Sequence, residues 1–306
     1  MDLTAAFPSF IVTLREGFEA ALVVGIVMAC LAKAQQQKLY PWVYGGIGAG
    51  IVGSVAVGII LATTVNSLTT TDSVYAPLIQ QVLAASFGII AIAMLSWMVL
   101  WMNAQAKSLK GEIESSINKA LKGDSAGKAV FLLVAIAVLR EGFETVLFIL
   151  AKFQQAWTLP TVGAVAGLSL AAILGWLLFA VGVKLDLRLF FQVMTVLLLL
   201  IVGGLVLGCL FHLDRALLLW SELSGNSWCF VGGDSCILGS QVWDGSQILP
   251  DKEFPGILLK ALFGYRQTLY LAQVAAYVSF LGFFAWFLNR DKLSLKNEDK
   301  GARQGN

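Results

Sequence analysis

The hexapeptide LREGFE occupies residues 14–19 and returns unchanged at residues 139–144. Each copy lies inside an apolar stretch of chain, about residues 7–32 for the first copy and 129–151 for the second. A motif repeated at such a long spacing indicates that the chain is built from two related units. Each copy also brings three charged side chains into an otherwise apolar stretch, so the repeat bears on both the fold and the chemistry of the chain.

The composition is that of a chain folded in lipid. Of its 306 residues, 58% are hydrophobic and 13% are charged, and the mean hydropathy is +0.79. A helix needs about 20 apolar residues to cross the core of a bilayer. Seven stretches are long enough, at about 7–32, 42–65, 78–102, 129–151, 160–183, 189–212 and 268–289. We therefore expect an all-α membrane protein with seven transmembrane helices in the lipid bilayer. The net charge of +2 argues for no nucleic-acid partner.

The two hexapeptides divide the seven predicted helices into two sets of three and one additional helix. The second helices of the sets also correspond weakly, with Gly50 in one and Gly167 in the other. Because three is an odd number, the sets cross the membrane in opposite directions, which makes an inverted 3+3 repeat. The predicted parts are the first repeat at 1–102, a cytoplasmic amphipathic linker at 103–127, the second repeat at 128–212, an external loop at 213–267, the seventh helix at 268–289 and a flexible, polar cytoplasmic tail at 290–306.

The lysines and arginines predict which side each loop occupies, because basic residues near helix ends stay in the cytoplasm. Of the 21 basic residues, 14 lie in alternate connections and in the C-terminal tail, whereas 5 lie on the other side. The remaining two are Arg15 and Arg140, inside the hexapeptides. This division places the N-terminus outside and the C-terminus inside, in a multi-pass protein of the plasma membrane.

Within each motif the charged residues share one side of the helix. At about 100° per residue, Arg15, Glu16 and Glu19 fall within one arc of about 100°. Arg15 can pair with Glu19, which follows it by one helical turn. Gly17 has no side chain, so another helix or an ion can approach closely. Both carboxylates of a motif can therefore face one cavity, and the second copy repeats the pattern.

The glutamates of the two motifs outnumber the arginines by two. Each charge at the centre of a bilayer costs about 2.5–3.5 kcal/mol on insertion scales, so a cation or protons must compensate the excess. Sites made only of oxygen atoms suit hard ions such as Fe³⁺, Mg²⁺, Ca²⁺ and Mn²⁺. The predicted metal ligands are Glu16, Glu19, Glu141 and Glu144, and the predicted supporting residues are Arg15 and Arg140.

Two other interpretations of the motifs stay open at this stage. The charged residues can form Arg–Glu bridges that only hold the two repeats together, although simple bridges do not need surplus carboxylates. A membrane di-iron enzyme also uses glutamate pairs on helices, but it typically needs Glu-x-x-His. Neither hexapeptide contains histidine. A transporter without a permanently bound cofactor, rather than an enzyme, is therefore expected.

Three features outside the motifs have two interpretations each. The linker at 103–127 carries apolar residues every fourth position, typical of a surface helix, and its Glu112 and Glu114 are a possible cytoplasmic exit for a metal ion. In the external loop, Cys229 and Cys236 form a disulfide or remain free thiols, and an oxidising compartment favours the disulfide. His212 ends the sixth apolar stretch and is expected to lie at the membrane interface.

Three segments together carry a resemblance to a known family. They are the two REGFE copies, the run from Trp101-Met102 to Lys110-Gly111-Glu112-Ile113-Glu114, and Lys184-Leu185-Asp186-Leu187-Arg188-Leu189-Phe190-Phe191. With these segments, residues 7–212 and the seventh helix resemble the oxidase-dependent iron transporter family, the high-affinity iron permeases of fungi and bacteria. After the sixth helix many bacterial relatives have a His-Glu pair, whereas this chain has Phe211-His212-Leu213-Asp214.

The resemblance implies a function for the two motifs. Arg15, Glu16 and Glu19, with their counterparts in the second copy, match the REXXE iron-translocation motifs of that family. The chain would then move iron, as the ferric ion, into the cytoplasm. An external oxidase or iron-delivery protein would supply the ion. From the residues alone, a divalent-cation or cation/proton exchanger that uses the same carboxylates is the alternative.

Overall fold

Seven long helices make up most of the described part of the chain. The computed structural model describes residues 3–69, 74–105, 115, 125–152, 158–182, 186–225, 229, 235–245, 249–250, 253 and 255–304. The long helices are α1 (Leu3–Lys33), α2 (Tyr40–Thr69), α3 (Ala76–Gln105), α5 (Ala126–Lys152), α6 (Thr158–Trp176), α7 (Leu187–Ser224) and α9 (Leu271–Gln304). The short elements are η1 (Gln37–Leu39), the π-helical turn η2 (Leu177–Val181), α8 (Gly256–Phe263), β1 (Gln241–Asp244) and β2 (Thr268–Tyr270).

The all-α prediction is confirmed, and several of the helices have the length and composition of membrane spans. Within the described ranges, four helical segments are long and apolar enough to cross a bilayer: Gln37–Ser67, Ala76–Leu100, Pro160–Val181 and Leu189–Ser224. Helices α1 and α5 are also long, but each carries the charged residues of one hexapeptide in its middle. The apolar part of α9 is shorter, at Leu271–Phe287. Membrane crossing by these three helices stays a prediction.

Helix α7 is longer than the predicted sixth span. Asp186 caps its start, where the Oδ1 atom accepts a hydrogen bond from the Leu189 amide at 3.2 Å. The helix ends at Ser224, and Gly225, which has a φ of 66°, caps it. It therefore continues twelve residues into the region predicted as external loop, because the end of an apolar pattern marks the edge of the lipid and not the end of the helix.

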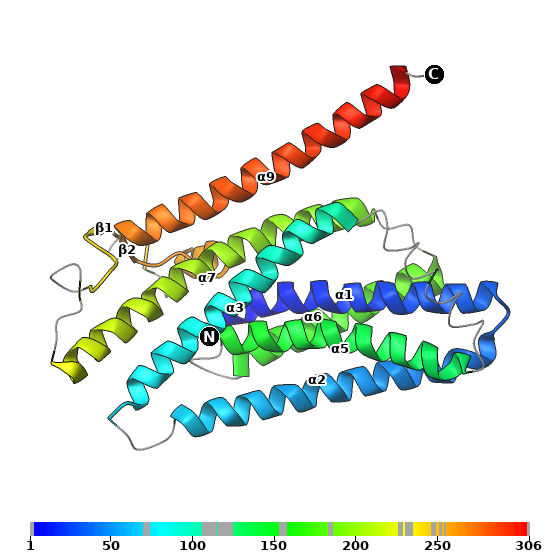
Figure 1. The fold of residues 1–306 in the computed structure, drawn as a ribbon, viewed down its shortest axis with the longest axis horizontal. Coiled ribbons are helices and arrows are strands. Elements are labelled where there is room, and N and C mark those ends of the chain that lie inside the picture. The colour runs from blue at the N-terminus through cyan, green and yellow to red at the C-terminus, as the bar shows by residue number, and fades with distance from the viewer. Residues whose placement is uncertain are drawn as a thin grey trace.

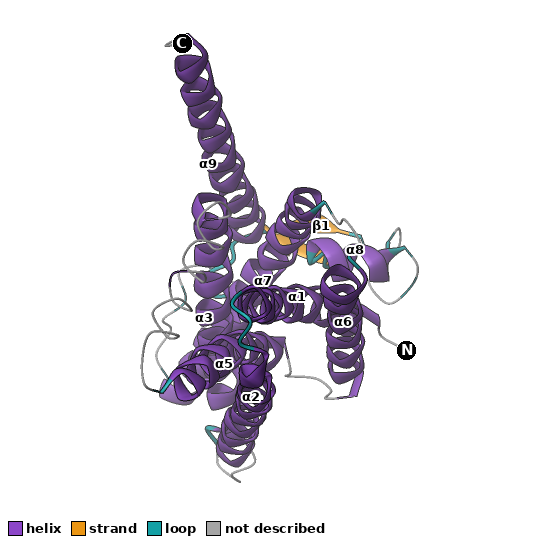
Figure 2. Cartoon of the chain, turned by 90° about the vertical axis from the view of Figure 1, so that its right-hand side faces the viewer, coloured by secondary structure: helices purple, strands orange, loops and turns teal. Residues whose placement is uncertain are grey.

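The region after α7 contains two strands and a short helix, which were not predicted individually. Strands β1 and β2 pair in antiparallel fashion, and α8 lies between them in the chain. The seventh helix starts at Leu271, after β2, and not at residue 268 as predicted. At its other end α9 continues to Gln304, so the tail predicted to be flexible is mostly helical. Its C-terminal end leaves the bundle (Figures 1 and 2).

The long helices pack in three main pairs. Helices α1, α2, α5 and α6 lie roughly alongside one another, and α3 and α7 cross one side of this group together (Figure 1). The most extensive contacts join α1 to α6, α2 to α5 and α3 to α7. Each hexapeptide helix thus packs on the second helix of the other predicted set. The two sets are interleaved and do not form separate lobes.

Small residues at every fourth position line the two most extensive of these helix contacts. In α6 they are Gly163, Gly167, Ala171 and Gly175, which face α1, and in α2 they are Gly46, Gly50, Ser54 and Gly58, which face α5. A Cβ atom at Gly167 would lie 2.5 Å from the Phe10 oxygen, and one at Gly50 would lie 2.7 Å from the Val138 Cβ. Such contacts let helix backbones approach closely in lipid. We call the two contacts the α1–α6 seam and the α2–α5 seam.

The seams contact matching positions when the two hexapeptides are aligned. Gly167 contacts Phe10 and Thr13 of α1, and Gly50 contacts the equivalent residues of α5, Ala135 and Val138. Further along the helices, Gly175 lies against Ala21 and Gly58 lies against Val146, and these two partners are again equivalent. The same spacing of small residues therefore produces the same packing twice.

Enlarging Gly142 should open the α2–α5 seam. A Cβ atom at Gly142 would overlap the Oγ atom of Ser54 and lie 2.5 Å from its Cβ. We expect Gly142→Ala to lower the free energy of unfolding in detergent by about 1–3 kcal/mol, the usual cost of overpacking. Adding Ser54→Gly removes both overlapping atoms and should restore most of the loss. A double variant no more stable than Gly142→Ala alone would contradict this account of the seam.

Candidate metal-ion site

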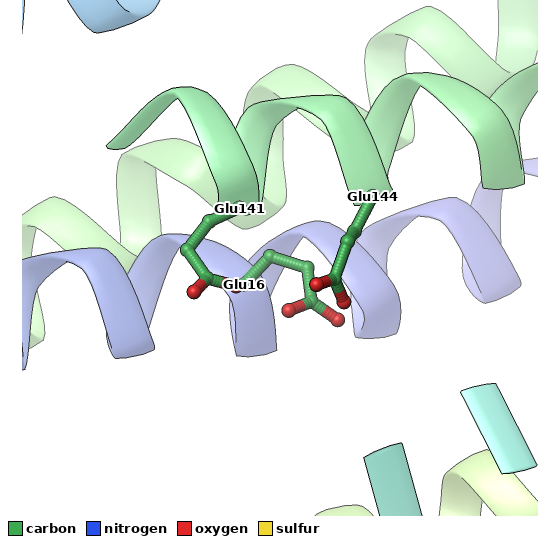
Figure 3. Close-up of side chains that lie close together, drawn as sticks. All are labelled: Glu16, Glu141 and Glu144. Carbon is green, nitrogen blue, oxygen red and sulfur yellow. The ribbon is translucent and has the colours of Figure 1, made fainter. Parts of the chain in front are cut away.

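The two hexapeptides meet where α1 lies against α5. Glu16 projects from α1, and Glu141 and Glu144 project from α5 into the same space (Figure 3). One carboxylate oxygen of each residue lies within 4.8 Å of the corresponding oxygens of the other two. Since the residues come from both motifs, the site exists only when the two repeats are packed together. Three of the four predicted ligands are thus brought into one group.

Arg15 lies beside this group and is almost completely buried. Its Nη1 atom is 2.9 Å from Glu16 Oε1, and its Nη2 atom is 2.8 Å from Glu19 Oε1. The guanidinium also contacts the sulfur of Met98, which belongs to α3. Only 1% of the Arg15 side chain is exposed. Glu19, the fourth predicted ligand, is therefore held by an ion pair with Arg15 and lies outside the group of three.

Arg140, the counterpart of Arg15, has a different environment. Its Nε atom donates to Glu144 Oε1 at 3.2 Å, again one helical turn along. About half of the Arg140 side chain is exposed, 53% against 12% for Glu144. The predicted i,i+4 ion pair is thus present in both motifs, but the arginine of the second pair is exposed.

Two oxygens of the group have no protein partner. The Oε2 atoms of Glu16 and Glu141 are buried and form no hydrogen bond with any described residue. A buried carboxylate oxygen without a partner is costly, and it is relieved by a proton or a metal ion. Three carboxylates at this spacing can offer oxygen ligands to one hard cation. The residues present therefore fit the predicted metal chemistry.

The remaining predicted positions lie elsewhere. Glu112 and Glu114 fall outside the described residues. Cys229 and Cys236 are joined in a disulfide, with their Cα atoms 4.4 Å apart. His212 lies on α7, and its Nδ1 atom is 2.7 Å from Gln81 Oε1 on α3, so it joins two helices far along the chain from the hexapeptides.

Two residues close to the site were not predicted to belong to it. Met98 contacts the Arg15 guanidinium. Ser54 lies against Gly142, which stands between Glu141 and Glu144 in the chain. Ser54 donates its hydroxyl to the Gly50 carbonyl at 2.8 Å. Nothing local marks Met98, because it belongs to an apolar helix with other methionines. The position of Ser54 could have been noticed, because it continues the four-residue spacing of glycines in α2.

Comparison with known proteins gives the family. The model of the iron permease FTR1 family matches residues 6–288. A protein of Synechocystis sp. named "Uncharacterized protein slr0964" is 52% identical over 283 residues, which cover 92% of each chain. "Ferrous iron permease EfeU" of Escherichia coli O6:H1 is 30% identical and covers 90% of this chain and 92% of its own. The protein of the same name in Yersinia pseudotuberculosis is 29% identical, with 90% of each chain covered. No solved structure matches. The chain belongs to the iron permease FTR1 family.

Proposed function

We propose that this protein carries iron across the plasma membrane into the cytoplasm, through a site formed by the two hexapeptides. The observation that supports this most strongly is the convergence of Glu16, Glu141 and Glu144 within 4.8 Å, with two buried oxygens that lack a partner. Membership of an iron permease family supplies the cargo. Glu19 is the fourth ligand in this proposal, and it shares its carboxylate between Arg15 and the ion.

The proposed architecture is an inverted 3+3 repeat with α9 as the seventh span. The two seams support it, because equivalent residues of α1 and α5 contact equivalent residues of α6 and α2. Transporters with inverted repeats bind their substrate near the midplane, between the repeats. The glutamate group lies between the first helices of the two sets, as that architecture requires.

The proposed orientation has the N-terminus outside and the C-terminus inside. The 14 to 5 division of basic residues supports it. We expect a reporter fused after Arg290 to show that this position lies in the cytoplasm. We expect an epitope inserted at Gly239 to be accessible to an antibody from outside. The reverse pattern would contradict the orientation, and the direction proposed for iron along with it.

Fe³⁺ is the proposed form of the cargo. A group made only of carboxylates favours a hard, highly charged ion, and the two hexapeptides have four glutamates for two arginines. Two of the three relatives named above are called ferrous iron permeases, so Fe²⁺ is the second candidate. Uptake of radioactive iron into proteoliposomes distinguishes the two. Uptake from ferric nitrilotriacetate in air supports Fe³⁺, whereas uptake that needs ascorbate supports Fe²⁺.

An external protein that delivers or oxidises iron is the proposed partner. If Fe³⁺ is the cargo, an oxidase or an iron-delivery protein at the outer face has to supply it, because free Fe³⁺ is poorly soluble. An exchanger for divalent cations or for cations and protons stays the alternative function. Competition decides between them, since an excess of Mn²⁺ or Ca²⁺ should leave iron uptake nearly unchanged in an iron permease and should suppress it in a general exchanger.

A further inference from the structure

The two hexapeptides are identical in sequence but differ in how deeply they are buried. Arg15 is 1% exposed and Arg140 is 53% exposed. The phenylalanines of the motifs differ in the same way, at 0% for Phe18 and 39% for Phe143. The seams pack equivalently in both halves, but the first motif has additional contacts, among them that of Met98 of α3 with Arg15. Phe18 packs on Phe190 of α7, at 4.4 Å between ring centroids.

The exposed side of α5 carries a charged side chain, that of Arg140, at a depth where contact with lipid is costly. Arg140 lies near the middle of α5, on a stripe of exposed residues that includes Leu132, Ile136 and Phe143. A guanidinium facing lipid at this depth costs about 2.5–3.5 kcal/mol on insertion scales, and charged residues within spans instead face water-filled cavities or protein. The position of Arg140 therefore indicates that water reaches this side of the glutamate group.

The ion pairs of the two arginines differ in how easily they can be broken. Arg15 is enclosed and bridges two carboxylates of its own helix, so it cannot leave without exposing buried charge. Arg140 is paired with Glu144, a member of the group of three, while half of its side chain is exposed. A guanidinium in that position can exchange a carboxylate for water at little cost. Of the two arginines, Arg140 is therefore the one whose pair with a metal ligand is partly exposed.

We propose that Arg140 is a displaceable counter-ion that competes with iron for Glu144. When iron binds, Arg140 moves from Glu144 into the water-filled side of α5. When Arg140 returns to Glu144, it restores the charge balance and helps to expel the ion on that side. Arg15 keeps its two carboxylates throughout and acts as the fixed counter-charge. This inference rests on the proposed function and assigns different roles to two arginines of identical local sequence.

Replacing Arg140 should raise the affinity for iron and slow its release. Binding of radioactive ferric nitrilotriacetate to purified Arg140→Gln is expected to be about 3- to 5-fold tighter than to the unaltered protein, the change that corresponds to losing one half-exposed ion pair. Release from preloaded proteoliposomes should slow by a similar factor. Arg140→Lys keeps the positive charge and should therefore bind iron less tightly, and release it faster, than Arg140→Gln does.

The outcomes separate this inference from the proposed function. If the unaltered protein binds iron but Arg140→Gln binds it equally or more weakly, the counter-ion role is wrong and the permease proposal stands. If the unaltered protein binds no iron, the proposed function itself fails. Tighter binding with slower release supports both.

Accessibility tests the water-filled side independently. In a chain with Cys30 and Cys209 replaced by alanine, Arg140→Cys should react with a charged methanethiosulfonate reagent. Val52→Cys, on an exposed apolar part of α2, should not react. Leu139→Cys serves in place of Arg140→Cys if that variant does not fold. Absence of reaction at both positions would overturn the inference, because lipid or a second copy would then cover this side of α5.

Discussion

Replacing Glu141 with glutamine should abolish iron transport while leaving the protein folded. Glutamine keeps the volume of the side chain but removes a negative charge and a strong oxygen ligand from the group of three. Changes in residues that merely orient metal ligands cost about 10- to 100-fold in affinity, so loss of a ligand should cost at least about 100-fold. Uptake of radioactive iron into proteoliposomes and iron binding in detergent measure the effect. The same result is expected for Glu16→Gln and Glu144→Gln.

Two matched variants make this experiment decisive. Glu222→Gln makes the same chemical change near the end of α7, away from the hexapeptides, and should bind and transport iron normally. Glu19→Gln tests the fourth predicted ligand. A loss as large as that of Glu141→Gln assigns it to the metal, whereas a small loss leaves it as a partner of Arg15 only. Normal iron binding by Glu16→Gln, Glu141→Gln and Glu144→Gln would leave the Arg–Glu bridges as simple connections between repeats.

Arg15→Gln should destabilise the protein strongly, and Arg140→Gln should not. Without Arg15, the carboxylates of Glu16 and Glu19 lose their buried partner, which typically costs about 3–5 kcal/mol. Arg140 is half exposed, so its pair with Glu144 contributes at most about 1 kcal/mol. Thermal unfolding of the two variants in the same detergent measures the difference. Equal losses of stability would contradict the difference in burial between the two arginines.

Arg15→Lys separates charge from shape. Lysine keeps the positive charge but has no planar fork that contacts two carboxylates at once. We expect part of the stability to be retained and iron transport to fall more than stability does. A lysine variant that transports normally would show that only the charge of Arg15 matters.

Much of the site could be predicted from the repeated hexapeptide in the sequence. Two copies of one motif on different helices, each with its charges on one side, indicated that carboxylates from both helices face one space, and Glu16, Glu141 and Glu144 do so. The i,i+4 relation also indicated the pairing of Arg15 with Glu19. The arrangement of charges within each motif depends on helix geometry, which the sequence determines locally, and the repeat indicated that the two motifs meet.

Other features depend on contacts between distant parts of the chain and could not be read locally. The hexapeptides are identical, so no local pattern distinguishes Arg15 from Arg140. Part of the difference in burial comes from two distant contacts on the first motif, Met98 of α3 on Arg15 and Phe190 of α7 on Phe18. The extension of α7 beyond the apolar stretch has a similar cause. Asp214 is buried there because it accepts hydrogen bonds from the amides of Cys236 and Ile237, each at 2.8 Å. The Cys236 amide, 22 residues further along the chain, compensates the negative charge of Asp214. Without such a partner, an aspartate indicates the end of a buried helix.

A structure of the protein soaked with iron, with anomalous scattering measured at the iron absorption edge, tests the central claim most directly. We expect one anomalous peak between α1 and α5, within coordination distance of carboxylate oxygens of Glu16, Glu141 and Glu144. The peak should disappear in crystals of Glu141→Gln. Iron bound only at positions away from both hexapeptides, with the three carboxylates unchanged, would contradict the proposed site.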